Sequence, residues 1–410
     1  MTIREDADTI IRESINAVLP DKATEKALRG KNFGNGRIRL VAAGKAAWQM
    51  AKAADQTLGS RIESGVVVTK YGHVKGPVAD YRCFEAGHPV PDENSFKATE
   101  EALDSVRGLT ENDTVLFLLS GGGSALFEKP LITGEELQDI TKQLLASGAD
   151  ITEMNTIRKR LSAVKGGRFA ELCSPAKVYC IVLSDILGDP LDMIASGPAY
   201  PDLSTSAEAI ALADKYHLRL STCAKRLLEK ETPKKLNNVE TVITGSVREL
   251  CRAAQDAANG LGYETVFLTD HLDCEAREAG IFSGDIALSH QNEKKSMAFI
   301  AGGETVVHLK GHGKGGRNQE LALSAAERLA FCRDTAVFSI GSDGTDGPTD
   351  AAGGYADEHT KTLISEKGLS VYKILEENDA YNGLKESGGL IVTGPTGTNV
   401  NDLTVILIRR

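Results

Sequence analysis

The feature that most constrains the fold is a repeated alternation of short apolar runs with longer amphipathic stretches. The runs 38–43 (IRLVAA), 114–119 (TVLFLL) and 178–183 (VYCIVL) are almost free of polar residues. Strands of this kind are buried on both faces, as in parallel sheets that are covered by helices. The sequence therefore predicts an α/β protein with mostly parallel sheets.

The same pattern continues along the whole chain. Predicted strands are 38–43, 65–69, 114–119, 178–183, 240–244, 264–268, 297–301, 304–309, 335–340, 389–392 and 403–408. Predicted helices are 45–58, 93–107, 134–147, 207–230, 246–260, 275–290 and 318–332. Because 410 residues are too many for one ordinary core, two domains are expected. The polar stretch 231–239, with Pro233, marks the boundary, which gives domains 1–235 and 236–410.

Composition argues against several classes of main partner, although a local basic cleft stays open as an alternative. Hydrophobic residues make up 41% and charged residues 25%, as in soluble globular proteins. A net charge of −10 argues against nucleic acid or an anionic membrane as the main partner. The N-terminal stretch is typical of an amphipathic helix and not of a signal peptide, and no apolar run approaches the ~18 residues of a membrane helix. Seven scattered cysteines without a CxxC pair indicate reduced thiols, so a cytoplasmic protein is expected.

Five glycine-rich clusters lie at or close to the ends of predicted strands. They are 43–45 (AGK), 119–124, 184–189 (SDILGD), 311–320 (GHGKGGRNQE) and 341–347 (GSDGTDG). Ligands of open α/β sheets bind beyond the carboxyl ends of the strands. Because these clusters are rich in Lys, Arg, Asp and Ser, they predict a shared site for an anionic ligand.

The cluster 120–124 (SGGGS) is a candidate phosphate cradle. Its glycines would let backbone N–H groups approach an anion, and a following helix would add its positive end. A plain turn between strand and helix remains the alternative, because three glycines alone are not specific. Lys45 follows the first strand and opens a helix, where a cation opposes the helix dipole unless an anion compensates it. Lys45 is therefore a candidate ligand of that anion.

The segment 311–316 formally matches GxGxxG but makes a poor dinucleotide fingerprint. It lies far along the chain, and no acidic residue stands clearly ~20 positions later to bind a ribose. Its cations Lys314 and Arg317 are unusual for a bare turn, and the guanidinium of Arg317 could bind a carboxylate or phosphate. A basic surface loop is the alternative.

Two acidic loops could hold a metal ion beside phosphates. Asp185 and Asp189 follow one strand, and Asp343, Asp346 and Asp350 follow another. Mg²⁺ is held by one or two carboxylates together with substrate phosphates. Any single aspartate in such a loop is more often a turn former than a ligand.

The basic segment 154–168 has two interpretations that stay open. It is either a solvated helix face or a wall of the anionic site, with Asn155 and Lys159 pointing inward. His88 and His308 are more often structural than catalytic. The chain has no HExxH, GxSxG or Walker A pattern, so zincin, α/β-hydrolase and P-loop functions lack support.

Taken in order, these motifs resemble the glycerate 2-kinase family, whose C-terminal part is called the MOFRL domain. The resemblance rests on LLSGGGSALFEKP, MNTIRKRLSAVKGGR, VLSDILGDPLDMIASGP, GGETVVHLKGHGKGGRNQELAL and SIGSDGTDGPTDAAGG. It covers nearly the whole chain. Some members were formerly labelled hydroxypyruvate reductases.

The resemblance implies an ATP-dependent kinase that converts D-glycerate to 2-phosphoglycerate. It also implies two three-layer α/β/α domains, the N-terminal one Rossmann-like, with the active site in the cleft between them, and ATP, Mg²⁺ and a homodimer. By motif, the implied catalytic residues are Lys45, Arg317 and Asp189. The implied nucleotide-binding residues are Ser120, Gly121, Gly122, Gly123, Ser124, Lys159, Gly315 and Asn318. The implied metal ligands are Asp185 and Asp343.

Two other functions remain as alternatives. One is an NAD(P)H-dependent hydroxypyruvate reductase, which the older family label favours. The strand and turn at 38–45 lack the three-glycine fingerprint, which argues against it. The other is a binding protein for a nucleotide or hydroxy acid that has lost catalysis.

Overall fold

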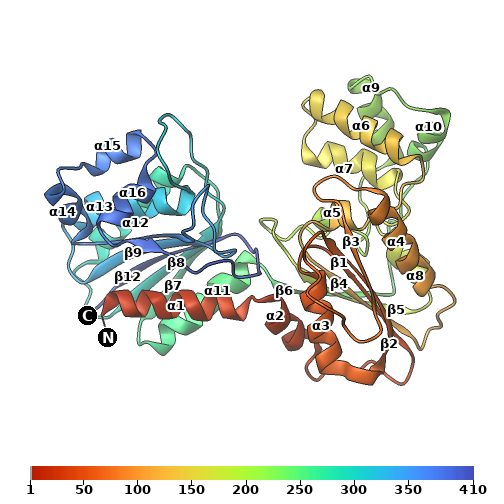
Figure 1. The fold of residues 1–410 in the computed structure, drawn as a ribbon, viewed down its shortest axis with the longest axis horizontal. Coiled ribbons are helices and arrows are strands. Elements are labelled where there is room, and N and C mark those ends of the chain that lie inside the picture. Colours follow the sequence, from red (N-terminus) through yellow and green to blue (C-terminus); the bar gives the residue numbers. More distant parts are fainter. Residues whose placement is uncertain (1) are drawn as a thin grey trace. The chain divides into compact units, whose positions relative to one another are not determined.

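The computed structural model describes residues 2–410 and divides into two compact units (Figure 1). The parallel-sheet unit consists of Ala23–Leu183 and Asp189–Thr244. The mixed-sheet unit consists of the N-terminal residues through Lys22, the short segment Ser184–Gly188, and Gly245–Arg410. The chain thus passes between the units several times, whereas the sequence prediction placed a single boundary at 235.

The parallel-sheet unit is built on a six-stranded sheet in the order β3-β2-β1-β4-β5-β6. The strands are β1 (Ile38–Ala43), β2 (Ile62–Lys70), β3 (Arg82–Ala86), β4 (Thr114–Leu119), β5 (Lys177–Leu183) and β6 (Val239–Gly245). Each of the pairs β3–β2, β2–β1, β1–β4 and β4–β5 is parallel. This is the strand order of dinucleotide-binding doubly wound folds, and it reverses direction between β1 and β4. The predicted parallel, Rossmann-like sheet is confirmed.

Helices cover both faces of this sheet. They are α2 (Pro20–Leu28), α3 (Ala47–Leu58), η1 (Gly59–Arg61), α4 (Glu93–Ser105), α5 (Gly123–Leu126), α6 (Gly134–Ala146), α7 (Ile151–Arg160), α8 (Arg168–Cys173), η2 (Ile194–Ser196), α9 (Ser206–Lys215) and α10 (Thr222–Leu228). Leu116 and Leu118 of β4 belong to the core that packs against α2 and α3. Phe117, between them, instead packs against Phe127 and Phe169 with ring centroids 5.5 and 4.7 Å away. Alternate side chains of β4 therefore enter different layers.

The mixed-sheet unit has a second six-stranded sheet in the order β11-β10-β9-β12-β8-β7. Its strands are β7 (Glu264–Leu272), β8 (Met297–Gly303), β9 (Thr335–Gly341), β10 (Gly353–Asp357), β11 (Leu390–Ile391) and β12 (Asp402–Ile408). The pair β7–β8 is parallel, whereas β12 is antiparallel to both β8 and β9. The pairs β10–β9 and β10–β11 are antiparallel as well. The mostly parallel pairing predicted from the apolar runs thus describes the first sheet better than the second.

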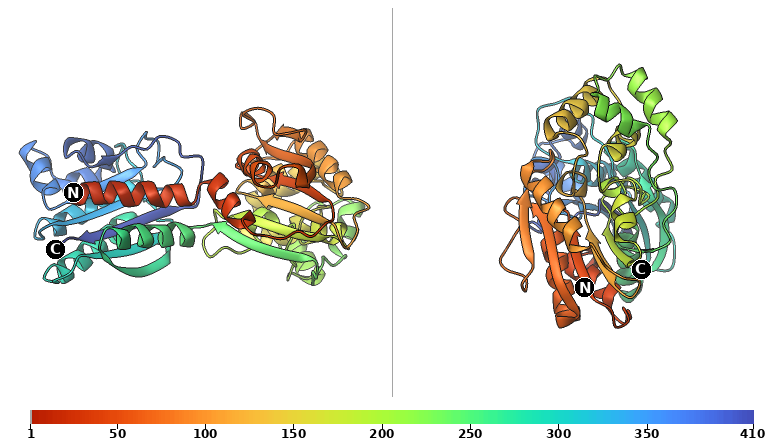
Figure 2. Two further views of the ribbon diagram at one scale, coloured as in Figure 1. Left: turned by 90° about the horizontal axis from the view of Figure 1, so that it is seen from below. Right: turned by 90° about the vertical axis from the view of Figure 1, so that its right-hand side faces the viewer.

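Helices also cover both faces of the mixed sheet. They are α1 (Ile3–Ala17), α11 (Val247–Gly260), α12 (Ala276–His290), α13 (Arg317–Leu329), α14 (Thr360–Glu366), α15 (Val371–Glu376) and α16 (Ala380–Glu386). On one face, Leu403, Val405 and Leu407 pack with α1 and α11, which lie side by side (Figures 1 and 2). On the other, Ile406 and Ile408 pack with α12 and α13. Both units are therefore three-layer α/β/α structures.

The N-terminal helix α1 confirms the predicted amphipathic helix. Its Ala7, Ile10 and Ile15 are buried in the core of the mixed sheet. Thr2 and Glu5 form a capping box at its start. None of the helices in residues 2–410 combines the length and apolar character that a membrane crossing needs.

Candidate functional site

The carboxyl ends of β1 and β4 form the point where the parallel sheet reverses its strand order. Lys45 follows β1, and Ser120–Ser124 follow β4. The Lys45 backbone N–H donates to Gly121 O over 2.9 Å, and the Ala46 N–H donates to Ser120 Oγ over 3.1 Å. Two segments that the sequence predicted as one anion site are thus joined by hydrogen bonds, because parallel neighbouring strands end at the same edge.

Gly122 has a conformation and surroundings that exclude a side chain. Its φ is +84°, and it caps the short helix α5. A Cβ atom built on it would lie 3.2 Å from Lys45 Cγ and 3.0 Å from His88 Cδ2. Within residues 2–410, the N–H groups of Gly121 and Gly122 donate to no protein acceptor, whereas the Gly123 N–H donates to Ser120 O. Two backbone donors are therefore available to an anion at this turn.

Buried polar side chains hold the far end of this loop. Lys165 is fully buried, and its Nζ donates to Ser124 O over 2.8 Å and approaches Glu128 Oε2 at 3.3 Å. Burial lowers the pKa of the Lys165 ammonium to about 8. Ser196 Oγ donates to Asn155 Oδ1 over 3.0 Å and lies 3.2 Å from Ser124 Oγ. Asn155 thus faces the loop indirectly, through Ser196.

Three more basic groups surround the turn, and the sequence analysis did not assign them to it. Lys70 ends β2, and His73 Nδ1 donates to Lys45 O over 3.0 Å, since a carbonyl can only accept. His88 follows β3 and lies against Gly122. Burial lowers the pKa of His88, and the charges of Lys45, Lys70 and His73 lower it further. We call Lys45, Lys70, His73, His88 and Ser120–Ser124 the switch-point site.

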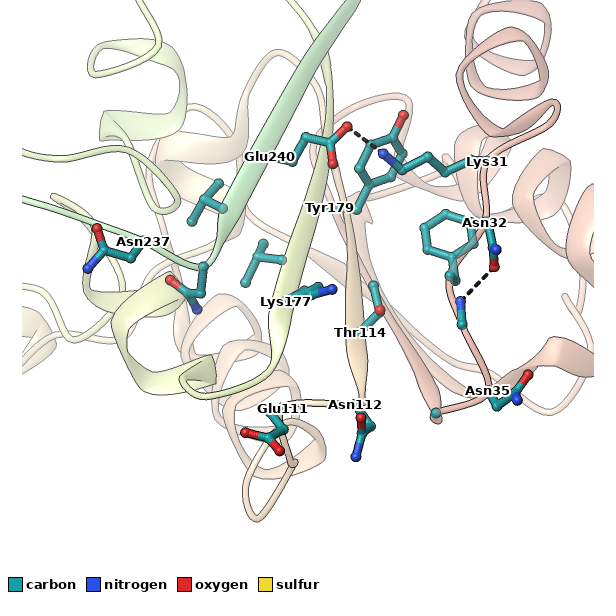
Figure 3. A pocket seen from close by; sticks show the side chains of 16 residues that line it. Lys31, Asn32, Asn35, Glu111, Asn112, Thr114, Lys177, Tyr179, Asn237 and Glu240 are labelled. Atoms are coloured by element: carbon teal, nitrogen blue, oxygen red, sulfur yellow. Dashed lines mark hydrogen bonds and ion pairs between the residues drawn. The ribbon is translucent and has the colours of Figure 1, made fainter.

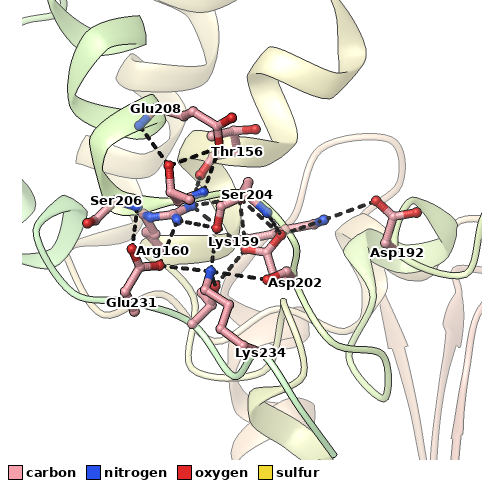
Figure 4. Close-up of polar contacts among 12 residues, drawn as sticks. Thr156, Lys159, Arg160, Asp192, Asp202, Ser204, Ser206, Glu208, Glu231 and Lys234 are labelled. Carbon is pink, nitrogen blue, oxygen red and sulfur yellow. Dashed lines mark hydrogen bonds and ion pairs between the residues drawn. The ribbon is translucent and has the colours of Figure 1, made fainter.

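Lys159 lies in a buried ion network (Figure 4). Its Nζ is 3.2 Å from Asp202 Oδ1 and 3.6 Å from Asp192 Oδ2. The neighbouring Arg160 is fully buried and donates to Ser204 Oγ and O. The segment predicted to be either a solvated face or an anion wall therefore carries cations that are paired inside the protein.

Asp189, the predicted base, has an unusual backbone and an unpaired oxygen. Its φ is +52°, a region that non-glycine residues rarely occupy. Its Oδ1 is buried without a hydrogen-bond partner in the described structure. Both features are typical of functional positions and require compensation elsewhere.

A polar cavity of about 210 Å³ lies in the mixed-sheet unit, and we call it the acidic cavity. It is lined by Asp185, Glu304, Arg317, Ser342, Asp343, Asn399, Asn401 and Asp402. Three predicted site residues, Asp185, Arg317 and Asp343, thus meet here. Arg317 and Asp343 converge because β8 and β9 end at the edge of the sheet where β12 begins. Asp185 comes to the cavity from the short segment Ser184–Gly188 of the same unit.

Arg317 is held by carboxylates of its own unit. Its Nε and Nη2 donate to the two oxygens of Asp402 over 2.5 and 3.0 Å. Its Nη1 donates to Glu304 Oε1 over 2.9 Å. Burial raises the pKa of Asp402 to about 6 although Arg317 opposes the shift, and the nearby Asp346 adds to the rise. This fork geometry fixes the direction of the guanidinium.

The glycine loop before α13 packs against protein and not around an open space. A Cβ atom on Gly313 would lie 2.4 Å from Asp379 Cβ, and one on Gly315 would lie 3.3 Å from Ala380 N. The Lys314 N–H donates to Asp379 Oδ1 over 2.8 Å. Asn318 is buried, and its Oδ1 accepts a hydrogen bond from Ser339 Oγ over 2.6 Å. The glycines of the GxGxxG match therefore permit close backbone packing.

The donor set of the acidic cavity fits Mg²⁺ only in company with phosphate oxygens. No group of three or more His, Cys, Asp or Glu side chains within residues 2–410 could hold a metal ion by itself. Four carboxylates line the cavity: Glu304 and Asp402 accept hydrogen bonds from Arg317, and Asp185 and Asp343 are the two predicted metal ligands. Mg²⁺ bound to a nucleotide commonly takes one or two protein carboxylates, so the residues present fit that group.

A second hollow, of about 830 Å³, opens at the amino ends of β4 and β5 (Figure 3). Asn32, Asn35 and Asn112 line it, and Lys31 Nζ pairs with Glu240 at 2.5 Å beside it. None of the predicted site residues lies there. It is at the opposite strand ends from the switch-point site.

Comparison with known proteins assigns the chain to a family. Residues 6–229 match the family described as Domain of unknown function (DUF4147), and residues 297–402 match the MOFRL family. The chain is 54% identical to the D-glycerate 2-kinase of Thermotoga maritima over 99% of both chains. The chain belongs to the glycerate 2-kinase family. The resemblance predicted from its motifs is confirmed.

Solved structures agree with this family. The crystal structure of a glycerate kinase from Thermotoga maritima superposes with a TM-score of 0.94, covering 98% of this chain and 99% of that chain. A relative from Agrobacterium vitis is 40% identical over 91% of this chain and 87% of its own, and is provisionally named a hydroxypyruvate reductase.

Proposed function

We propose that this protein phosphorylates D-glycerate with ATP and Mg²⁺ to give 2-phosphoglycerate. The single observation that carries the proposal is the hydrogen-bonded pairing of Lys45 with the 120–124 loop at the switch point of the parallel sheet. The family membership supports it, since relatives that align over the full chain are named glycerate 2-kinases. Its proposed compartment is the cytoplasm, and a homodimer stays a prediction.

In this proposal the switch-point site holds the nucleotide phosphates. Two unused N–H groups, those of Gly121 and Gly122, point to an anion ligand rather than a bare turn. The hydroxyls of Ser120 and Ser124 lie on the same loop, and the ammonium of Lys45 supplies positive charge. Stabilising charge on a transferred phosphoryl group is the main task of a kinase site.

Residues of the acidic cavity would supply the other charged groups that phosphoryl transfer needs. Mg²⁺ would supply positive charge beside the phosphates of ATP. Asp185 and Asp343 would hold the cation, and Arg317, fixed by Asp402, would stabilise negative charge. Asp189 would accept the proton of the attacking hydroxyl through its unpaired Oδ1. That these residues act together in an interdomain cleft stays a prediction.

The nucleotide contacts predicted for Lys159, Gly315 and Asn318 also stay predictions. The polar atoms of Lys159 and Asn318 are paired with other residues of the protein, and Gly315 packs against Ala380. We therefore give them no chemical role in the reaction.

Reduction of hydroxypyruvate is the second candidate, because the strand order matches dinucleotide-binding folds and one relative carries a reductase name. Two parallel assays separate the functions. D-glycerate with Mg²⁺·ATP should release ADP, and hydroxypyruvate with NADH or NADPH should show no oxidation of the cofactor. Cofactor oxidation without ADP release would overturn the proposal. ATP binding without turnover would instead support a binding protein.

A further inference from the structure

From the sequence alone, His88 was expected to have a structural role and not a catalytic one. It follows β3, which β2 and β1 separate from β4 in the sheet, yet its ring reaches the 120–124 loop. A Cβ atom on Gly122 would lie 3.0 Å from His88 Cδ2 and 3.1 Å from His88 Nε2. The edge of the imidazole that carries Nε2 therefore faces the turn with the two unused N–H groups.

The imidazole of His88 has no hydrogen bond or ion pair within the part of the chain that the structure describes. Two other histidines show the contrast. His73 Nδ1 bonds to Lys45 O over 3.0 Å, and His271 Nδ1 lies 2.7 Å from Asp270 Oδ1. A half-buried imidazole without a partner retains full capacity to bind a ligand.

The titratable groups around His88 are mainly basic side chains. Lys45 comes from the turn after β1, and Lys70 and His73 come from the end of β2. An acid, Asp92, stands at the N-cap of the following helix α4, and its carboxylate accepts from Tyr71 and Ser95. Burial and the three basic neighbours lower the pKa of His88 below its usual 6.5.

The arrangement has a direct consequence for an anionic ligand. With no anion bound, burial and the basic neighbours both favour the neutral form of His88. A polyanion placed between Lys45, His88 and the glycine loop would reverse the local field and favour the imidazolium. The added proton would come from solvent and bind an imidazole nitrogen, with no other bond changed.

We propose that His88 is an anion-binding residue of the switch-point site, which takes up a proton when nucleotide phosphates bind and then donates a charge-assisted hydrogen bond to them. The proposal rests on the proposed function, because it takes ATP as the ligand. It adds a phosphate contact outside the glycine loop and the residues predicted from motifs.

Proton uptake can be measured by titration calorimetry with a non-hydrolysable ATP analogue and Mg²⁺ at pH 7. Buffers of different ionisation enthalpy that carry no phosphate, such as PIPES and Tris, separate proton uptake from binding heat. The variants are His88→Gln and His88→Asn, with His359→Gln as control, since the His359 side chain is 75% exposed in the other unit. Thermal unfolding of each variant checks its fold, and either folded variant suffices.

The wild type and the control should take up protons when the analogue binds. Both His88 variants should show no such uptake, so their binding heats should be the same in the two buffers. Binding by these variants should weaken about tenfold at pH 6 and less at pH 8, because only the charged imidazole donates a charge-assisted bond. Equal uptake and equal affinity in wild type and His88 variants would overturn the proposal alone. Failure of the wild type to bind the analogue would overturn the proposed function as well.

Discussion

Lys45 is the residue on which the switch-point site depends most. Its N–H is tied to Gly121 O, and its carbonyl accepts from Thr69 and His73, so its backbone is fixed on several sides. Lys45→Ala should lower kcat by ~10³-fold with little effect on folding, since charge stabilisation dominates phosphoryl transfer. Steady-state kinetics would measure this, with Lys52→Ala in the following helix α3 as the matched control. A Lys45→Ala enzyme with near wild-type kcat would contradict the assignment.

Gly122→Ala tests the turn itself. The new methyl group would meet Lys45 and His88 at 3.2 and 3.0 Å, on a backbone with φ +84°. The KM for ATP should rise at least about tenfold, because the loop backbone is strained or the Lys45 and His88 side chains are displaced. An alanine in the left-handed region destabilises the folded backbone by about 1–2 kcal/mol even without a clash. Gly148→Ala, also at positive φ (+73°) but with open space around it, controls for backbone strain. Equal KM values for the two variants would remove the ligand-related reason for Gly122.

The raised pKa of Asp402 predicts how the stability of the fold depends on pH. Its folded pKa of about 6 exceeds its usual 3.8, so the folded state binds its proton more tightly than the unfolded state. Between these two pH values, stability from this group falls as pH rises. Relative to Asp402→Asn, the wild type should lose on the order of 2 kcal/mol between pH 4.5 and 7, measured by urea unfolding. A pH-independent difference between the two proteins would contradict the raised pKa.

At the residue scale, the positions of site residues that directly follow strands could be predicted from the sequence. The positions of residues that depend on tertiary packing could not. Lys45 and Ser120–Ser124 stand directly after apolar strands, so their convergence could be predicted. His88 follows the half-exposed strand β3, which has no strong apolar signal. The burial of Lys159 and Asn318 depends on partners such as Asp202 and Ser339, which are distant in sequence and invisible to a local pattern.

At the element scale, most predicted strands and helices are present, and the exceptions have identifiable causes. The strand predicted at 304–309 was wrong, because β8 ends at Gly303, where its partner β12 begins at Asp402, and beyond it only Val306 forms an isolated bridge, with Glu275. The helix predicted over 207–230 is two helices, since the backbone of His217 turns to φ +49° between them.

Two strands escaped prediction because their side chains are atypical. β3 (Arg82–Ala86) carries Arg and Glu and lies at the sheet edge. β10 (Gly353–Asp357) starts with two glycines, and a Cβ on Gly354 would lie 2.6 Å from Leu384 and 3.0 Å from Ala322. The two glycines therefore give β10 a low β-propensity, but they allow helices to pack closely against it.

A buried ion pair, Lys165 with Glu128, contacts the backbone of the short helix α5 through Lys165 Nζ. Lys165→Met would leave Glu128 charged and unpaired at 0% exposure and should cost about 3–5 kcal/mol in urea unfolding. Lys165→Met combined with Glu128→Gln should recover most of that loss, because the unpaired charge is gone. If the double variant were as unstable as the single one, the hydrogen bonds of Lys165 to Ser124 O and Phe127 O would stabilise the fold more than the ion pair does.

At the scale of the whole chain, α1 belongs to the mixed-sheet unit although it opens the sequence. Its Ile10 and Ile11 cover core residues of α11 and β12. A fragment 245–410 should therefore aggregate or unfold, since it exposes this apolar face. Fusing residues 2–19 to that fragment through a flexible linker should restore a cooperative thermal transition. A cooperative transition in the unfused fragment would contradict this role of α1.

The domain boundary illustrates what a linear sequence cannot convey. A polar stretch with Pro233 marks a real exit from helix α10, but the assignment of α1 and of Ser184–Gly188 to the other unit depends on long-range packing. The fold class and family could be predicted from strand patterns and motif order. Which segments pack together could not.

Phosphorus NMR of the product is the most direct test of the central claim. Incubating the protein with D-glycerate, ATP and Mg²⁺ should give 2-phosphoglycerate and ADP, and the Lys45→Ala variant should give almost none in the same time. A 3-phosphoglycerate product, or no phosphorylated glycerate from the wild-type protein, would contradict the account.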